Sequence, residues 1–146
     1  MSSLNEKLLD SWIDLSLSIM NERIVSELPY NESLICNILS RQERNYPGSV
    51  LTATELCQMM QMQKSQMNRT LTTMEEKGLI TRERSCTDKR QVFIRLSENP
   101  ESIYQRQHEM ILGIVDRVIE KMGEEKAEML ADVFAKLAET AEDVLK

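Results

Sequence analysis

The fold is decided by residues 52–97, which read TATELCQMMQMQKSQMNRTLTTMEEKGLITRERSCTDKRQVFIRLS. Thr52 and Glu55, three places apart, form a capping box of the kind that opens a helix. After this short helix and a break of a few residues, a second helix is expected from Lys64 to Lys77, because Gly78 supplies a left-handed stop. A short helix, a turn and a second helix are typical of a helix-turn-helix motif.

A β-hairpin is expected directly after the second helix. Residues 80–84 and 91–96 are rich in strand-forming side chains, and Val92, Ile94 and Leu96 alternate toward one face of the second strand. The loop between the two strands is polar. A hairpin in this position is called a wing, so the sequence predicts a winged helix-turn-helix domain.

The segment before this motif is expected to be helical. Apolar residues recur at intervals of three or four in residues 4–27 and again in residues 31–44, which predicts two helices. Pro29 ends the first of them, and Asn31 is a candidate cap for the second. Residues 50–51 are expected to form a very short strand.

The segment after the wing is also expected to be helical. Asn99-Pro100-Glu101 restarts a helix, with proline near its first position, and Gly123 separates that helix from a last one. The predicted fold class is therefore mainly α with a small β-hairpin wing. Its predicted domains are a helical dimerisation region, residues 1–28 and 99–146, and a winged helix-turn-helix DNA-binding domain, residues 29–98.

The terminal helices are longer and more apolar on one side than a core of this size requires. Such a surface is typical of an interface, and a second copy of the chain is the expected partner. The alternative is that the two ends pack on each other in a monomer.

The charge is unevenly distributed along the chain. The net charge is −6, which by itself argues against nucleic-acid binding. Residues 64–95, however, hold eight Lys or Arg against four Asp or Glu, a local balance of +4. Affinity for phosphate depends on the local footprint and not on the total, so this segment suits double-stranded DNA. An ordinary solvated surface is the alternative interpretation.

The second helix of the motif has two chemically different sides. Met67, Leu71 and Met74 form an apolar stripe. The other side carries amides, hydroxyls and one guanidinium, which are groups that pair with base edges and phosphates in the major groove. These candidate DNA-binding residues are Ser65, Gln66, Asn68, Arg69 and Thr72. We predict that Arg69 reads a guanine and Gln66 an adenine, against the alternative of an ordinary polar helix face.

The wing carries a compact charged sequence, Asp88-Lys89-Arg90. A basic tip can enter a narrow minor groove, where the negative potential is concentrated. We predict that Arg90 makes this contact, that Lys89 binds phosphate, and that Asp88 holds the arginine or caps the loop amides. A hairpin that is polar only because it is solvated is the alternative.

These motifs, in this order and spacing, resemble the MarR family of transcription regulators. The resemblance covers nearly the whole chain and rests on residues 71–82 (LTTMEEKGLITR), residues 88–90 (DKR) in place of the family's Asp-x-Arg wing signature, and residues 93–97 (FIRLS). It implies a homodimer, with the recognition helix in the major groove and the wings in the flanking minor grooves. By position it also implies DNA binding for Arg82, the arginine that opens the wing.

The resemblance further implies a mode of regulation. Such proteins are usually repressors that bind a pseudo-palindromic operator, and some release it on binding a small aromatic or phenolic ligand between their dimerisation and DNA-binding parts. This chain departs from the family pattern at three places: Gln61 replaces a common glycine, Gln63 is a poor helix cap, and Asn99-Pro100 replaces a glycine after the wing.

The sulfur-containing residues and the single histidine have mainly structural interpretations. Cys36 and Cys57 have apolar neighbours and are expected in the core, as is the run of residues 59–62 (MMQM), although a ligand-adaptable pocket is the alternative for this run. Cys86 is expected to be exposed in the wing, with Arg84 favouring its thiolate, so that its oxidation weakens DNA binding. His108 is expected at the surface or in dimer packing and not as a metal ligand.

The sequence also argues against several functions. It shows no Ser/His/Asp constellation, phosphate loop or metal-ligand spacing, so neither an enzyme nor a cofactor is expected. It has no apolar run long enough for a membrane span and no secretory signal, so a cytoplasmic location is expected. The main alternative to DNA binding is a winged helix that serves as a protein-interaction module with little DNA specificity.

Overall fold

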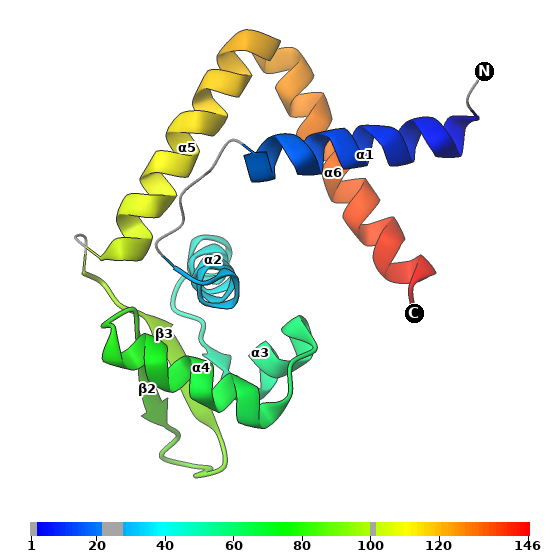
Figure 1. Cartoon of the computed structure of the whole chain (residues 1–146). Helices are drawn as coiled ribbons and strands as arrows, with labels where there is room; N and C mark the ends of the chain where they lie inside the picture. The colour runs from blue at the N-terminus through cyan, green and yellow to red at the C-terminus, as the bar shows by residue number, and fades with distance from the viewer. Residues whose placement is uncertain (1–2, 22–27, 100–101) are drawn as a thin grey trace. The chain divides into compact units, whose positions relative to one another are not determined.

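The structure is a computed structural model that describes residues 3–21, 28–99 and 102–146. In chain order the elements are α1 (Leu4–Asn21), α2 (Tyr30–Asn45), β1 (Leu51–Thr52), α3 (Ala53–Met60), α4 (Lys64–Glu76), β2 (Ile80–Arg84), β3 (Val92–Leu96), α5 (Ile103–Met122) and α6 (Glu124–Val144) (Figure 1). The expected class, mainly helical with a small β-wing, is confirmed. None of these helices is long and apolar enough to cross a membrane.

The chain forms two compact units, Met1–Gln107 and His108–Lys146. The boundary between them falls inside α5, whose first turn packs on α2 within the first unit. There the Tyr104 hydroxyl donates to Asn37 Oδ1 at 3.0 Å, and Gln107 Nε2 donates to Ser33 Oγ at 3.0 Å. The predicted division into a dimerisation region and a DNA-binding domain stays a prediction.

The helix-turn-helix motif forms as the sequence predicts. Thr52 caps α3, and its hydroxyl oxygen accepts from the backbone N–H of Glu55 at 3.1 Å. Gln61 ends α3 in the left-handed conformation, with φ 51° and ψ 44°. That conformation crowds the β-carbon of any L-residue, which explains why a glycine is common in this turn.

Helix α4 follows the turn and presents its apolar stripe to the core. Gln63 precedes it without a side-chain cap bond, as its residue type predicts, and Gly78 follows its end with φ +75°. Met67, Leu71 and Met74 have no exposed surface at all. Each buried side chain of this size stabilises the fold by about 1.5–3 kcal/mol relative to an exposed one, so the stripe fixes which side of α4 faces outward.

The wing belongs to a three-stranded antiparallel sheet of order β1-β3-β2. The predicted hairpin is confirmed: β2 pairs with β3 from Ile80 opposite Leu96 to Arg84 opposite Val92. The short strand lies one residue later than predicted and pairs with the other edge of β3, with Leu51 opposite Ile94. In Figure 1 α4 lies against the sheet, in agreement with its packing on β2.

Three predicted helix boundaries need correction or limits. Asn31 is not a cap, because α2 begins at Tyr30 with Pro29 before it and no side-chain cap bond. Helix α5 begins at Ile103, later than expected, and the Ser102 hydroxyl accepts from the Gln105 backbone N–H at 3.1 Å, as in a capped helix. The ends of two predictions, residues 22–27 and 100–101, lie outside the described residues.

One long-range ion pair joins α2 to the end of the recognition helix. Lys77 Nζ lies 2.8 Å from Glu32 Oε1, and the Glu32 side chain is only 7% exposed. A buried carboxylate is costly without a partner. The pair therefore fixes the C-terminal end of α4 against α2.

Candidate nucleic-acid interface

The candidate interface begins with the outward side of α4. All five residues predicted to bind DNA on this helix are exposed: Ser65, Gln66, Asn68, Arg69 and Thr72. This exposure agrees with the prediction, whereas contact with DNA remains a prediction. Among the residues that the structure describes, Arg69 has no ion-pair partner, so its guanidinium is available to a ligand.

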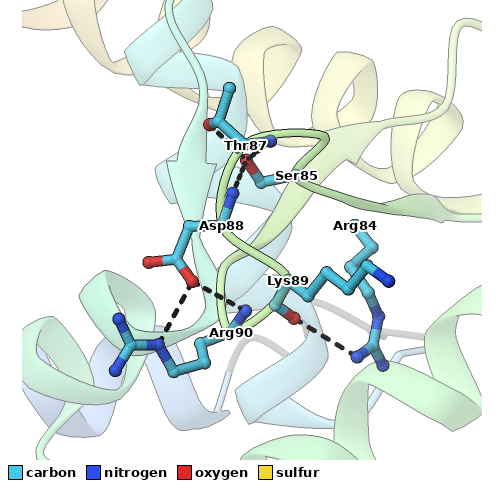
Figure 2. A network of polar contacts seen from close by, with 6 residues as sticks. All are labelled: Arg84, Ser85, Thr87, Asp88, Lys89 and Arg90. Atoms are coloured by element: carbon cyan, nitrogen blue, oxygen red, sulfur yellow. Dashed lines mark hydrogen bonds and ion pairs between the residues drawn. The ribbon is translucent and has the colours of Figure 1, made fainter.

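The base of the wing loop is organised by a buried serine. The Ser85 hydroxyl oxygen accepts from the backbone N–H groups of Thr87 and Asp88, at 3.2 Å each, and lies 3.1 Å from the Thr87 hydroxyl (Figure 2). The Ser85 N–H donates to the Gln91 carbonyl at 2.9 Å and closes the loop. Since only 6% of Ser85 is exposed, its hydroxyl is part of the fold of the loop.

Asp88 positions Arg90 as the sequence suggests. One carboxylate oxygen of Asp88 accepts from the Arg90 backbone N–H at 3.0 Å and from its Nε at 3.2 Å (Figure 2). The Arg90 side chain is 91% exposed. At this exposure the ion pair contributes little to stability, about 0–1 kcal/mol. The ion pair instead orients the Arg90 side chain, and the remaining guanidinium nitrogens point into open solvent.

A second arginine braces the other side of the loop. Arg84 Nη1 donates to the Lys89 carbonyl at 3.2 Å, and Figure 2 shows the Arg84 and Arg90 side chains on opposite sides of the loop. The sequence places Arg84 near Cys86, where it was expected to favour the thiolate. The hydrogen bond that Arg84 makes is to the main chain of Lys89 instead, and the effect on Cys86 stays a hypothesis.

Arg82 ties the first wing strand to the recognition helix. Its Nη2 lies 3.0 Å from Glu75 Oε1, and its backbone N–H donates to Glu75 Oε2 at 3.2 Å. The hydrogen bond from Arg82 holds the pKa of the Glu75 carboxyl below its usual range. Arg82 thus has a structural partner, and its predicted role in DNA binding remains a prediction.

Several residues that shape this interface could not be identified from the sequence. Arg84 was expected only at the end of the first wing strand, beside Cys86, and Ser85 only as part of the polar loop, although a serine hydroxyl often bonds the backbone two residues on in such a turn. Glu75 stood out only as part of the polar end of α4. Glu32 and Lys77 are 45 residues apart, and no local pattern links them.

The three cysteines are free thiols in distinct environments. Cys36 is fully buried, and burial, with a smaller contribution from Glu32, raises the pKa of its thiol to about 12. Cys57 is half-buried against the core, and Cys86 is exposed, so the three expected positions are confirmed. Of the methionine run, Met60 and Met62 pack on the core, whereas Met59 is 52% exposed.

A cavity of about 410 Å³ lies in the first unit, between the C-terminal half of α2 and the sheet. Leu39, Leu51 and Ile94 form its apolar part, and Arg44 and Arg95 lie among its polar lining residues. All lining residues fall between Leu39 and Glu98, inside the predicted DNA-binding domain. The ligand pocket expected between the two predicted regions therefore stays a prediction. In the described parts of the chain, no cluster of His, Cys, Asp or Glu could hold a metal ion.

The exposed polar helix, the buried stripe beneath it and the braced hairpin define a winged helix-turn-helix protein. The sequence model of the MarR family matches residues 28–91, which include the helix-turn-helix motif and the wing loop. Over these residues the chain resembles the MarR family, as the sequence motifs predicted.

One curated protein is similar to this chain in sequence, and several solved structures are similar to it in fold. The chain is 35% identical over 75 residues to the HTH-type transcriptional regulator FarR of Neisseria gonorrhoeae, a match that spans 51% of each protein. Its fold is similar to that of a mutant of MepR from a multidrug-resistant clinical isolate of S. aureus, with a TM-score of 0.71, 15% identity and coverage of 96% of this chain and 99% of that one. FabT of Streptococcus pneumoniae, solved in complex with DNA, has a TM-score of 0.67, 21% identity and coverage of 95% and 96%.

Proposed function

We propose that this protein is a homodimeric transcription regulator that binds a specific, pseudo-palindromic DNA operator. Helix α4 enters the major groove, and the wing reaches the adjacent minor groove. The observation that carries the proposal is the outward side of α4, where Gln66, Asn68 and Arg69 are exposed above a stripe with no exposed surface. A helix buried on one side and lined with base-pairing groups on the other has the chemistry of a recognition helix.

The wing supports the same proposal. Asp88 aims Arg90 outward, and Ser85 and Arg84 hold the loop that carries it. A preorganised arginine loses less side-chain entropy on binding than a mobile one. The DNA complex of FabT, a protein of similar fold, is consistent with this use of the fold.

A homodimer is part of the proposal because apolar side chains remain exposed on α1 and α6. Trp12 is 62% exposed, and Phe134 is 47% exposed. Most soluble oligomers pair identical surfaces around a two-fold axis, which matches a two-fold-related operator. The similar proteins FarR and FabT come from bacteria, where operator DNA lies in the cytoplasm, so the proposal includes action there.

The proposal extends to repression that is relieved by a small aromatic or phenolic ligand. NadR, whose fold is similar at a TM-score of 0.65 and 23% identity, was solved in complex with 4-hydroxyphenylacetate. If this chain responds to such compounds, 4-hydroxyphenylacetate or benzoate at millimolar concentration raises the melting temperature of the protein and lowers its affinity for DNA. Unchanged melting and affinity with a panel of such acids would remove this part of the proposal.

The test of DNA recognition compares single arginine variants on duplex DNA that the wild-type protein selects from a random library. We expect Arg69→Ala to lose about 1–3 kcal/mol of binding and to relax the preference at one base pair. We expect Arg90→Ala to weaken binding with less change in sequence preference. Arg117→Ala, an exposed arginine in the second half of α5, is the matched control and binds as wild type does. Equal affinity of all four proteins would contradict the proposed interface.

A further inference from the structure

Three threonines of α4 turn their hydroxyl groups back onto the helix. Thr72 Oγ1 donates to the Asn68 carbonyl at 2.9 Å, Thr70 to the Gln66 carbonyl at 2.9 Å, and Thr73 to the Arg69 carbonyl at 3.1 Å. The hydroxyl hydrogen is thereby committed to the main chain. Such a threonine has no hydrogen left to donate to a phosphate or to an acceptor on a base edge.

Thr72 is the one of the three that the sequence places among the predicted DNA-binding residues. At about 100° per residue, it falls between Asn68 and Arg69 and nearly in line with Ser65, within roughly 100° of arc. It therefore lies on the outward side of α4 next to Arg69, and it is exposed, as is Thr73 on the other side of Arg69. Thr70 is half-buried at the flank of the helix. With its hydroxyl hydrogen turned back, Thr72 offers a ligand its methyl group and an oxygen that can only accept.

We propose that Thr72 reads a thymine by contact between its methyl group and the C5 methyl group of the base. In the major groove only thymine presents a methyl group, and apolar contact with it distinguishes this base from the others. Each operator half-site then holds an A·T pair at the position facing Thr72, beside the base that Arg69 reads. This inference rests on the proposed function, because it specifies the chemistry of the same interface.

The test uses two variants that separate the methyl group from the hydroxyl group. Thr72→Val keeps the methyl and removes the hydroxyl, whereas Thr72→Ser keeps the hydroxyl and removes the methyl. Affinity is measured on the operator selected by the wild-type protein and on copies in which each thymine in turn is replaced by deoxyuridine, which lacks only the C5 methyl group. We expect Thr72→Val to bind as wild type does and Thr72→Ser to lose about fourfold per contact, the value of one buried methyl-sized group.

The decisive result is the coupling between protein and base. At one thymine per half-site, deoxyuridine weakens wild type and Thr72→Val by about the same fourfold, and it leaves Thr72→Ser unchanged. Thr70→Ser is the matched control, since it removes a methyl from a threonine with the same helix contact but away from this surface. It keeps the sensitivity of wild type to that deoxyuridine.

Other outcomes overturn the inference. Loss of binding in Thr72→Val but not in Thr72→Ser makes the hydroxyl the reading group. If both variants bind with wild-type affinity, the side chain of residue 72 does not contact the bases. If Thr72→Ser binds more weakly but loses sensitivity to no deoxyuridine substitution, the substitution acts on the helix and not on a base contact. If the wild-type protein selects no consensus at all, the proposed function fails before any variant is made, so the two failures are distinguishable.

Discussion

Gln61 holds a backbone conformation that glycine adopts at no steric cost. Its φ of 51° places it in the left-handed region, where a β-carbon crowds the following carbonyl. The turn between α3 and α4 still forms, because the capped start of α3 and the buried stripe of α4 determine it from both sides. The strain therefore resides in one residue and should be removable by one substitution.

We expect Gln61→Gly to raise the free energy of unfolding by about 0.5–1 kcal/mol, because relief of left-handed strain exceeds the added backbone entropy of glycine. Chemical denaturation measures this difference. Gln58→Gly, at an exposed position inside α3, is the control and should destabilise by about 1 kcal/mol. A loss of stability in Gln61→Gly would mean that the side chain itself supports the turn.

The carboxyl group of Glu75 gives a pH-dependent prediction. The hydrogen bond from Arg82 holds the pKa of Glu75 below its ordinary value. The ionised carboxylate therefore stabilises the folded protein at any pH above the ordinary pKa, and this stabilisation is lost as the pH falls through the lowered pKa of the folded state. The difference in unfolding free energy between wild type and Glu75→Gln should thus be present at neutral pH and vanish in the acid range below pH 4.5. A difference that does not change with pH would argue against the ion pair in solution.

The thiols differ in reactivity for reasons of exposure and pKa. A disulfide-exchange reagent at pH 8 should modify the exposed Cys86 rapidly, whereas Cys36, whose pKa is about 12, should react only on unfolding. The fast phase should disappear in Cys86→Ser. If oxidation of Cys86 weakens operator binding, peroxide lowers the affinity of wild type but not that of this variant; equal responses would exclude that role.

At the scale of elements, α2 supports the recognition helix from behind. Glu32 on its first turn pairs with Lys77 at the end of α4, and Asn37 on its second turn accepts from Tyr104 of α5. A rigid contact of this kind sets the direction in which the outward side of α4 faces. The two ends of the Glu32–Lys77 pair are unequally buried, with 7% of the glutamate and 35% of the lysine side chain exposed.

This asymmetry predicts unequal effects of the two single variants. Lys77→Met leaves a buried carboxylate without its cation and should cost about 2–3 kcal/mol, whereas Glu32→Gln leaves a lysine that can reach water and should cost about 1 kcal/mol. The double variant should recover part of the loss. Denaturant unfolding measures all three, and a Lys77→Met that is no less stable than Glu32→Gln would show that the carboxylate is solvated.

The elements themselves could be predicted from the sequence because their signals are local. Thr52 with Glu55, the stripe Met67–Leu71–Met74 and the stop at Gly78 each lie within a few residues of the feature that they determine. Contacts that depend on tertiary placement could not be predicted in this way, such as Glu32 with Lys77 or β1 with β3. The prediction of Asn31 as a helix cap was wrong. Asparagine is common at cap positions, but α2 already begins at Tyr30, directly after Pro29.

The residues of the candidate site likewise fall into those that could be predicted from local sequence and those that depend on tertiary placement. Exposure of Arg69 and of Arg90 followed from periodicity and from the loop composition. The partners that hold the site, Ser85 within the loop and Glu75 across the Gly78 turn, became visible only once the backbone brought them together. The sequence thus predicts which side chains the surface carries, whereas the contacts that position those side chains depend on the fold.

At the scale of the whole molecule, the chain combines one basic segment with an acidic remainder. Residues 64–95 carry the local balance of +4 within a net charge of −6. If residues 64–95 bind DNA as proposed, the acidic remainder should repel DNA from the rest of the surface. The apolar sides of α1 and of α6 are two further surfaces that we propose for dimerisation.

If these apolar surfaces join two chains, Trp12→Glu and Phe134→Glu should each shift the protein from a dimer to a monomer in sedimentation, because they place charges in a desolvated contact. Operator binding should weaken in the same variants, because the dimer is lost. Tyr46→Glu is the control, since Tyr46 is 64% exposed in the turn after α2 and should leave both unchanged. A wild-type protein that sediments as a monomer would contradict the dimer.

Sequence-specific binding of DNA is the property on which the proposed function depends, and selection from a random duplex library at about physiological salt, followed by sequencing, measures it. We predict a consensus of two inverted half-sites whose centres lie about one helical turn apart. Recovery of unenriched sequences, with only weak and salt-sensitive binding, would contradict sequence-specific recognition and would favour a winged helix that binds another protein.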